Sequence, residues 1–228
     1  IVHRYPRRVL FLVSNTCATL CRFCTRKRMV SQPSGSVHKD AIEQSIDYIA
    51  ANTQIQDVLL SGGDPLTFTD DRLDEILGEI RRRAPHVRFL RLGTRMIVQL
   101  PTRITPELCA LLEKHRVQMV NTHINHPKEI TPLLRARVKM LQKAGIMMGL
   151  QTVCLKGVND DVEVMRDPQQ PISGTLQAIA TIGLGNYHFL RAQGFFNAEQ
   201  AQNAGLAQCA AAFSGTKLAL GSSPDGPN

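Results

Sequence analysis

Short apolar runs alternate with amphipathic segments at intervals of about 30 residues over most of this 228-residue chain. Strands are predicted for Val9–Ser14, Asp57–Ser61, Val87–Gly93, Val117–Ile124 and Ile146–Leu155. Helical spacing of apolar residues follows each strand, in Lys39–Ala51, Asp70–Ala84, Thr105–Leu112, Thr131–Ala144 and Asn159–Arg166. Five strand–helix units imply parallel strands with right-handed crossovers, in either an open doubly wound sheet or a full or partial (β/α) barrel.

The ends of the predicted helices carry recognisable signals. Asp70 is predicted to cap the second helix and Pro85 to stop it. Thr105 precedes a proline at the first helical position of the third helix. Gly145 is predicted to end the fourth helix.

The most unusual polar residues fall at the ends of the predicted strands. A cysteine cluster follows the first strand, Ser61–Asp64 follows the second, and Gly93–Arg95 follows the third. Asn121–His126 closes the fourth strand, and Gln151 lies on the fifth. In both candidate architectures, ligands bind at the carboxyl ends of the strands. We therefore expect one shared site at this edge of the sheet.

The composition excludes several classes of protein. With 43% hydrophobic residues the chain is not wholly disordered, and no apolar run approaches the roughly 20 residues of a membrane helix. The net charge of +8 is spread along the chain, and base-stacking surfaces are scarce at 5% aromatic residues without tryptophan. We therefore expect a cytoplasmic protein with no membrane or nucleic-acid partner. Its positive charge is expected on solvated helices and in a pocket for an anionic ligand.

Three of the six cysteines lie within eight positions, in the pattern Cys17-x3-Cys21-x2-Cys24. In a reduced cytosolic chain, such a cluster indicates a metal site rather than disulfides. Three thiolates on one loop can hold three irons of a [4Fe–4S] cluster and leave the fourth iron open to a small molecule. Zinc would need a fourth donor, and idle thiols are a third alternative. Cys109 and Cys154 are predicted to pack inside their helix and strand.

The cysteine pattern stands within an ordered series of motifs between residues 3 and 167. The motifs are His3–Leu12, Cys21–Arg28, Leu60–Asp64, Arg91–Arg95, Leu100–Thr105, Asn121–Pro127 and Lys156–Asp160. The cysteine pattern alone resembles the radical S-adenosylmethionine (SAM) superfamily. The full series resembles the lysine 2,3-aminomutase family within it, which includes glutamate 2,3-aminomutases.

This resemblance implies a partial (β/α) barrel, a [4Fe–4S] cluster, SAM and pyridoxal phosphate (PLP). The implied reaction moves an amino group from Cα to Cβ of an amino acid. An electron from the cluster breaks a C–S bond of SAM, the 5′-deoxyadenosyl radical takes hydrogen from Cβ, and the amino nitrogen migrates as an imine to PLP. The implied partners are a small amino-acid substrate and an electron donor such as flavodoxin or ferredoxin. A homo-oligomer is compatible with the sequence.

The resemblance also implies roles for individual residues. The implied cluster ligands are Cys17, Cys21 and Cys24. The implied SAM contacts are Ser61, Gly62, Gly63, Asp64, His123 and Gln151. The implied contacts of the PLP phosphate are Arg4, Tyr5 and Arg8, and Arg26 is implied to pair with the substrate α-carboxylate. Without the resemblance, Ser61–Asp64 would be interpreted as a turn and His123 as a buried histidine. Arg4, Tyr5 and Arg8 would be interpreted as a solvated basic strand.

The chain departs from the family pattern after Asp167. Residues 168–228 contain four charged side chains and 8 of the 16 glycines, without strand–helix alternation. We expect residues 1–167 to form the barrel and residues 168–228 to form a divergent, weakly structured tail. No PLP imine lysine is found, because Lys217 lacks the Gly-rich neighbours of the family, so PLP binding is left open. Since Ile1 leads straight into strand-like sequence, we also expect a truncated or spliced product.

Three alternatives to an aminomutase remain on sequence grounds. A related radical SAM enzyme could modify a lysyl group on a translation factor. A non-enzymatic metal-binding or nucleic-acid-binding protein is supported only by the charge. The third alternative is an inactive fragment that binds SAM and an iron–sulfur cluster.

Overall fold

The computed structural model describes residues 1–30, 37, 39–153 and 155–159. Residues 1–124 and 128–153 form one compact unit, whereas residues 125–127 and 155–159 belong to a second unit. The first unit is built on a six-stranded sheet in the order β1-β2-β3-β4-β5-β6. Its strands are β1 (Val2–Tyr5), β2 (Arg8–Ser14), β3 (Asp57–Gly62), β4 (Phe89–Gly93), β5 (Met119–Thr122) and β6 (Met147–Leu150).

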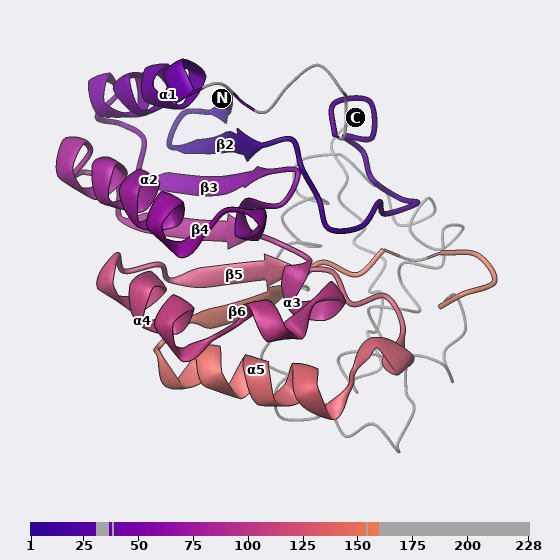
Figure 1. The fold of residues 1–228 in the computed structure, drawn as a ribbon. Helices are drawn as coiled ribbons and strands as arrows, with labels where there is room; N and C mark the ends of the chain where they lie inside the picture. The colour runs from indigo at the N-terminus through magenta and orange to yellow at the C-terminus, as the bar shows by residue number, and fades with distance from the viewer. Residues whose placement is uncertain (31–36, 38, 154, 160–228) are drawn as a thin grey trace, which may run out of the picture. The chain divides into compact units, whose positions relative to one another are not determined.

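The strand order decides between the two predicted architectures. β1 pairs antiparallel with β2, and β2 to β6 are parallel to one another. A doubly wound sheet reverses its strand order at a switch point, but no reversal occurs among the described strands. Right-handed crossovers that always step in one direction place the crossover helices on one face, and Figure 1 shows the longer helices stacked in chain order along the sheet. The structure confirms an α/β fold of consecutive βα units, as in a partial (β/α) barrel.

Threonine caps begin three of the helices. The helices are α1 (Lys39–Ala51), α2 (Asp70–Arg83), α3 (Met96–Gln99), α4 (Pro106–Lys114) and α5 (Pro132–Lys143), with 3-10 turns η1 (Pro65–Thr67), η2 (Pro101–Arg103) and η3 (Pro127–Glu129). The side chains of Thr69, Thr105 and Thr131 each accept a hydrogen bond from a backbone N–H of the first turn. The prediction that Asp70 caps α2 is wrong, because Thr69 holds the cap and Asp70 is the first helical residue. Gly145, with φ +73°, follows α5 as predicted.

Several predicted boundaries differ from the observed ones. β6 ends at Leu150, so Gln151 follows this strand instead of lying on it. The basic N-terminal segment forms β1 and pairs as a hairpin with β2. No helix within the described ranges is long and apolar enough to cross a membrane.

Some predictions concern parts of the chain that the structure does not describe. The predicted helix beyond Asn159 and the tail of residues 168–228, which includes Lys217, lie outside the described residues, and so does Cys154. The described residues of the second unit include Leu155, whose N–H donates to Asn159 Oδ1 at 2.6 Å.

The two faces of the parallel sheet differ in character. Alternate strand residues, such as Val9, Phe11, Leu60 and Leu92, are fully buried. The apolar residues of the helices are also buried, among them Ile42, Ile46, Ile49, Leu73, Ile76, Leu77, Ile80, Leu108, Leu112, Leu134 and Leu141. Since successive strand residues point to opposite faces, this pattern assigns one face of the sheet to the helices.

The opposite, inner face carries small and polar side chains near the carboxyl ends of the strands. The register aligns Leu12 with Ser61, and Gly93 with Asn121 and Gly149. A Cβ on Gly93 would lie 3.1 Å from Ser61 Oγ, and a Cβ on Gly149 would lie 2.1 Å from Asn121 Oδ1. The two glycines therefore leave room for the polar side chains of the neighbouring strands.

Arg81 on α2 ties three segments of the fold together. Its guanidinium donates to the backbone carbonyls of His115 at 2.7 Å, Val87 at 2.8 Å and Arg116 at 2.6 Å. These carbonyls lie at the end of α4 and before β4 and β5, where a helical or sheet partner is missing. Arg82, the next residue, pairs instead with an acidic side chain one turn back on the exposed face of α2.

Arg81→Met should lower the free energy of unfolding by roughly 2 kcal/mol, because three carbonyls lose a charged donor. Arg82→Met is the matched control and should leave stability unchanged within error, since it removes only an exposed ion pair. Urea denaturation followed by circular dichroism measures both variants. Equal effects of the two substitutions would contradict the role of Arg81.

Candidate functional site

Gly62 and Gly63 hold the base of the cysteine loop against the end of β3. The Gly63 N–H donates to Ser14 O at 2.5 Å, and the N–H of the following residue donates to Thr16 O at 2.7 Å. A Cβ on Gly62 would meet Ser14 O at 2.1 Å, and a Cβ on Gly63 would meet Thr16 O at 2.2 Å. Gly62 also has φ +124°, a backbone angle that residues other than glycine rarely adopt. The close backbone approach occurs directly before Cys17.

The Asp64 carboxylate is fully engaged inside the protein. Its Oδ1 accepts hydrogen bonds from Thr94 Oγ1 at 2.6 Å and from the Leu66 N–H at 3.0 Å. Its Oδ2 accepts from the N–H groups of Arg95 at 2.8 Å and Met96 at 3.1 Å. Burial raises the pKa of the Asp64 carboxyl, while these hydrogen bonds act in the opposite direction. Because four donors already occupy this carboxylate, we expect it to brace the ends of β3 and β4 and not to contact SAM directly.

The three clustered cysteines lie on the loop after β2, and each is half-buried. Burial is the main cause that raises the pKa of Cys17 to about 11, with further increases from Asp64, Cys21 and Cys24 and an opposing effect of Arg26. Within the described ranges, no three His, Cys, Asp or Glu side chains converge closely enough to hold one metal ion. A [4Fe–4S] cluster needs each thiolate to bind a different iron, and three neighbouring thiols on one loop provide that set of donors.

Arg26 reaches from the cysteine loop to the end of β3. Its Nη2 donates to the Oγ of the buried Ser61 at 2.9 Å. The Nε of Arg26 is buried and has no hydrogen-bond partner among the described residues. A buried donor left unpaired costs about 1–3 kcal/mol, so its position favours an anionic ligand. The structure thus brings a predicted carboxylate-binding residue next to a predicted SAM residue.

His123 directly follows β5, and its Nδ1 forms a hydrogen bond to the backbone carbonyl of Gln151, which follows β6. Its ring packs edge-on against Phe23 of the cysteine loop, with 5.4 Å between the ring centroids. Burial lowers the pKa of His123, the hydrogen bond to Gln151 opposes this effect, and the cations Arg95 and Arg26 lower the pKa further. The neutral ring donates through Nδ1–H, which leaves Nε2 as an acceptor.

Two residues to which the sequence assigned no role contact the cysteine loop. Arg95 Nη1 lies 3.4 Å from Cys21 Sγ, and its guanidinium carbon lies 5.3 Å from the centroid of the Phe23 ring. Gln99 Nε2, one turn later on α3, lies 3.8 Å from the same sulfur. Arg95 follows the third predicted strand, where polar site residues were expected, but α3 is too short to give a periodic signal.

The residues predicted to bind the PLP phosphate lie at the other end of the sheet. Arg4 and Tyr5 belong to β1, and Tyr5 pairs in register with Arg8 at the start of β2. Arg8 Nε lies 3.0 Å from Asp57 Oδ2, and Arg91 contacts both carboxylate oxygens of Asp57 at 2.8 Å. Since β2 rises about 20 Å from Arg8 to its carboxyl end, the structure does not bring this group together with the cysteine edge.

The cysteine loop and the polar residues at the carboxyl edge lie within a region that matches a known family. The family model of the radical SAM superfamily matches residues 11–167. The chain belongs to the radical SAM superfamily. Membership implies a [4Fe–4S] cluster and SAM, and it confirms the resemblance predicted from the cysteine pattern.

Curated relatives of this radical SAM protein are 2,3-aminomutases. L-lysine 2,3-aminomutase of Methanococcus maripaludis is 49% identical over 172 residues, which cover 75% of this chain and 40% of the relative. L-lysine 2,3-aminomutase of Fusobacterium nucleatum is 46% identical over 166 residues, which cover 73% of this chain and 39% of the relative. Glutamate 2,3-aminomutase of Clostridioides difficile has the same identity and coverage over 166 residues. The chain therefore spans less than half the length of these relatives.

Gly63→Ala should lower the free energy of unfolding by about 1–3 kcal/mol, because its Cβ would collide with backbone atoms of Thr16. Gly78→Ala is the matched control. Its Cβ would lie 3.5 Å from His115 Cε1, an ordinary contact, and alanine favours the interior of α2 by up to about 1 kcal/mol. Urea denaturation measures both variants, and a destabilised Gly78→Ala beside an unaffected Gly63→Ala would contradict this interpretation.

Alkylation of Cys17 in the metal-free protein should keep accelerating up to about pH 11. The reactive species is the thiolate, and a thiol with a pKa of about 11 is only about 1% ionised at pH 9, against about half for a pKa of 9.0. Iodoacetamide labelling at a series of pH values, followed by peptide mass spectrometry, measures the rate at this residue. A rate that levels off below pH 9 would show that the thiol is not shielded as described.

Proposed function

We propose that this radical SAM protein binds its cluster through Cys17, Cys21 and Cys24 and catalyses the shift of an amino group from Cα to Cβ of a free amino acid. The observation that carries the proposal is that the cysteine loop, the Gly62–Gly63 turn and His123 share one edge of the sheet. Relatives named lysine and glutamate 2,3-aminomutase support the reaction and the amino-acid substrate. An electron donor such as flavodoxin or ferredoxin and a cytoplasmic location belong to the same proposal.

The residues of the chain would bind and orient the reactants. When bound, the cluster and SAM supply a carbon-centred radical that removes hydrogen from an unreactive C–H bond. Ser61 and the turn that follows it would bind the amino group of SAM, and His123 Nε2 would accept a further hydrogen bond, with Gln151 beside it. Arg26, whose Nε is buried and unpaired among the described residues, would hold the substrate carboxylate.

We extend the proposal to PLP, whose phosphate Arg4, Tyr5 and Arg8 would bind. Arg8 and Arg91 both contact the carboxylate of Asp57, so two guanidinium groups lie at this end of the inner face. Such charge and the forked donors of arginine favour a dianionic phosphate. The family resemblance supports the same assignment.

Anaerobic treatment of the full chain with iron and sulfide should give a brown protein with about four irons per chain. Addition of SAM and dithionite should then release 5′-deoxyadenosine, which liquid chromatography measures. Replacing Cys17, Cys21 and Cys24 by serine together should abolish both results, because the thiolate ligands are lost.

Cys109→Ala is the control, because this buried cysteine belongs to α4 and not to the cysteine loop, so its loss should not affect the iron content. A colourless protein that binds one zinc ion would refute the cluster assignment. Incubation with lysine and with glutamate, followed by separation of α- and β-amino acids, tests the rearrangement itself.

A further inference from the structure

We propose that Arg95 is a positioning residue that raises the reduction potential of the cluster, and that Glu129 opposes this effect. The inference rests on the cluster-binding role proposed above. It concerns a cation that donates to the sulfur of Cys21 and that none of the roles assigned so far explains.

Arg95 is fixed by contacts along its whole length. Its backbone N–H donates to Asp64 Oδ2 at 2.8 Å, and its Nε lies 3.4 Å from His123 O. Its guanidinium lies over the Phe23 ring and forms an ion pair with Glu129. These contacts leave Nη1 directed at the Sγ of Cys21, at 3.4 Å.

The surroundings of Arg95 are partly shielded from water, which strengthens its charge effects. Its side chain is 17% exposed, and that of Glu129 is 26% exposed. Charges in such surroundings are screened less than exposed ones. The positive charge of Arg95, close to the Cys21 sulfur, therefore raises the reduction potential of the cluster. The negative charge of Glu129 lowers it.

Gln99 adds a neutral donor to the same sulfur. Its Nε2 lies 3.8 Å from Cys21 Sγ, on the helix that begins directly after Arg95. The buried Asp64 accepts hydrogen bonds from the first N–H groups of this segment and so fixes both donors relative to the cysteine loop. The end of β4 thus supplies a charged and a neutral donor to one cluster ligand.

The direction of the effect follows from charge. Reduction adds one electron to the cluster, so cations and N–H donors at its sulfurs favour the reduced state, whereas a nearby carboxylate disfavours it. Removing the charge of Arg95 should make the potential more negative. Removing the charge of Glu129 should make it less negative.

The test is a potentiometric titration of the reconstituted full chain, without SAM, in which electron paramagnetic resonance follows the reduced cluster. Arg95→Met should lower the ratio of reduced to oxidised cluster at a fixed potential on the order of tenfold, which corresponds to about 59 mV for one electron. Glu129→Gln should shift the ratio in the opposite direction. Gln99→Leu should shift it in the same direction as Arg95→Met, but less.

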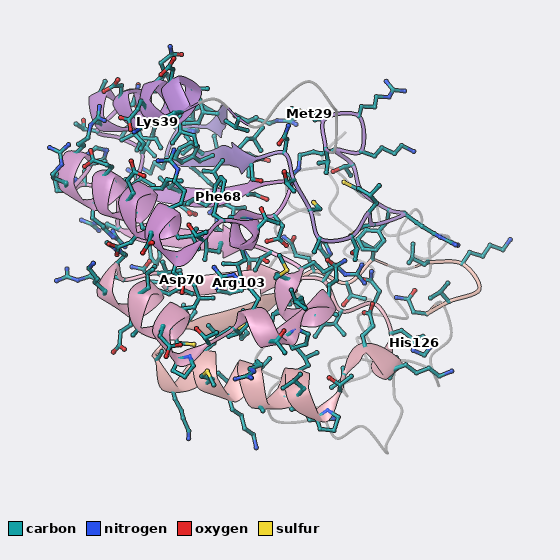
Figure 2. The ribbon with its side chains drawn as sticks, in the orientation of Figure 1. Met29, Lys39, Phe68, Asp70, Arg103 and His126 are labelled. Carbon is teal, nitrogen blue, oxygen red and sulfur yellow. The ribbon has the colours of Figure 1, made fainter. Side chains whose placement is uncertain are left out.

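Arg103→Met is the matched control. Arg103 donates to Leu66 O at 3.0 Å, Phe68 O at 2.9 Å and Asp70 Oδ1 at 2.6 Å. Figure 2 labels Arg103 with Phe68 and Asp70. The same substitution here should weaken the fold and leave the potential unchanged. The variant therefore separates loss of structure from loss of charge at the sulfur.

Unchanged potentials, or shifts of the same sign in Arg95→Met and Glu129→Gln, would overturn the inference while the cluster assignment stands. If Arg95→Met takes up no cluster, the other two variants test the inference. It then requires a less negative potential in Glu129→Gln and a slightly more negative potential in Gln99→Leu. If the unsubstituted chain takes up no cluster, the proposed function fails first and this inference with it.

Discussion

The candidate site depends on one close backbone contact, between the turn after β3 and the start of the cysteine loop. Two N–H groups of the Gly62–Gly63–Asp64 segment donate to carbonyls of Ser14 and Thr16, at distances that leave no room for a Cβ. The contact therefore fixes the start of the cysteine loop, directly before Cys17.

Around this contact, charges of both signs are held at short range. Asp64 is buried beneath four donors, and it raises the pKa of Cys17, whereas Arg26 lowers it. Arg95 donates to the sulfur of Cys21 and pairs with Glu129. The loop thus lies in an electrostatic environment that β3, β4 and the segment after β5 supply together. These neighbouring segments therefore set the electrostatic properties of the three thiols.

The sequence predicted the repeating units well because each is determined locally. Helix α1 has the predicted bounds, and the threonine–proline cap of α4 is where the sequence places it. Short elements were missed for the same reason, since the four residues of α3 show no periodicity. The cap of α2 was placed one residue late, because Thr69 and Asp70 are both good capping residues and only the backbone distinguishes them.

By itself, the sequence determined the α/β alternation, the cysteine loop and the edge at which polar residues gather, because hydrophobic period and residue spacing are properties of the chain alone. Only the tertiary structure decided that Thr94 donates a hydrogen bond to Asp64, that Arg26 donates to Ser61, and that Arg95 reaches Cys21. Each of these contacts joins residues that are 30 or more positions apart. The register of the parallel strands brings distant strand ends to one edge and so determines which residues meet. No local sequence pattern specifies this register.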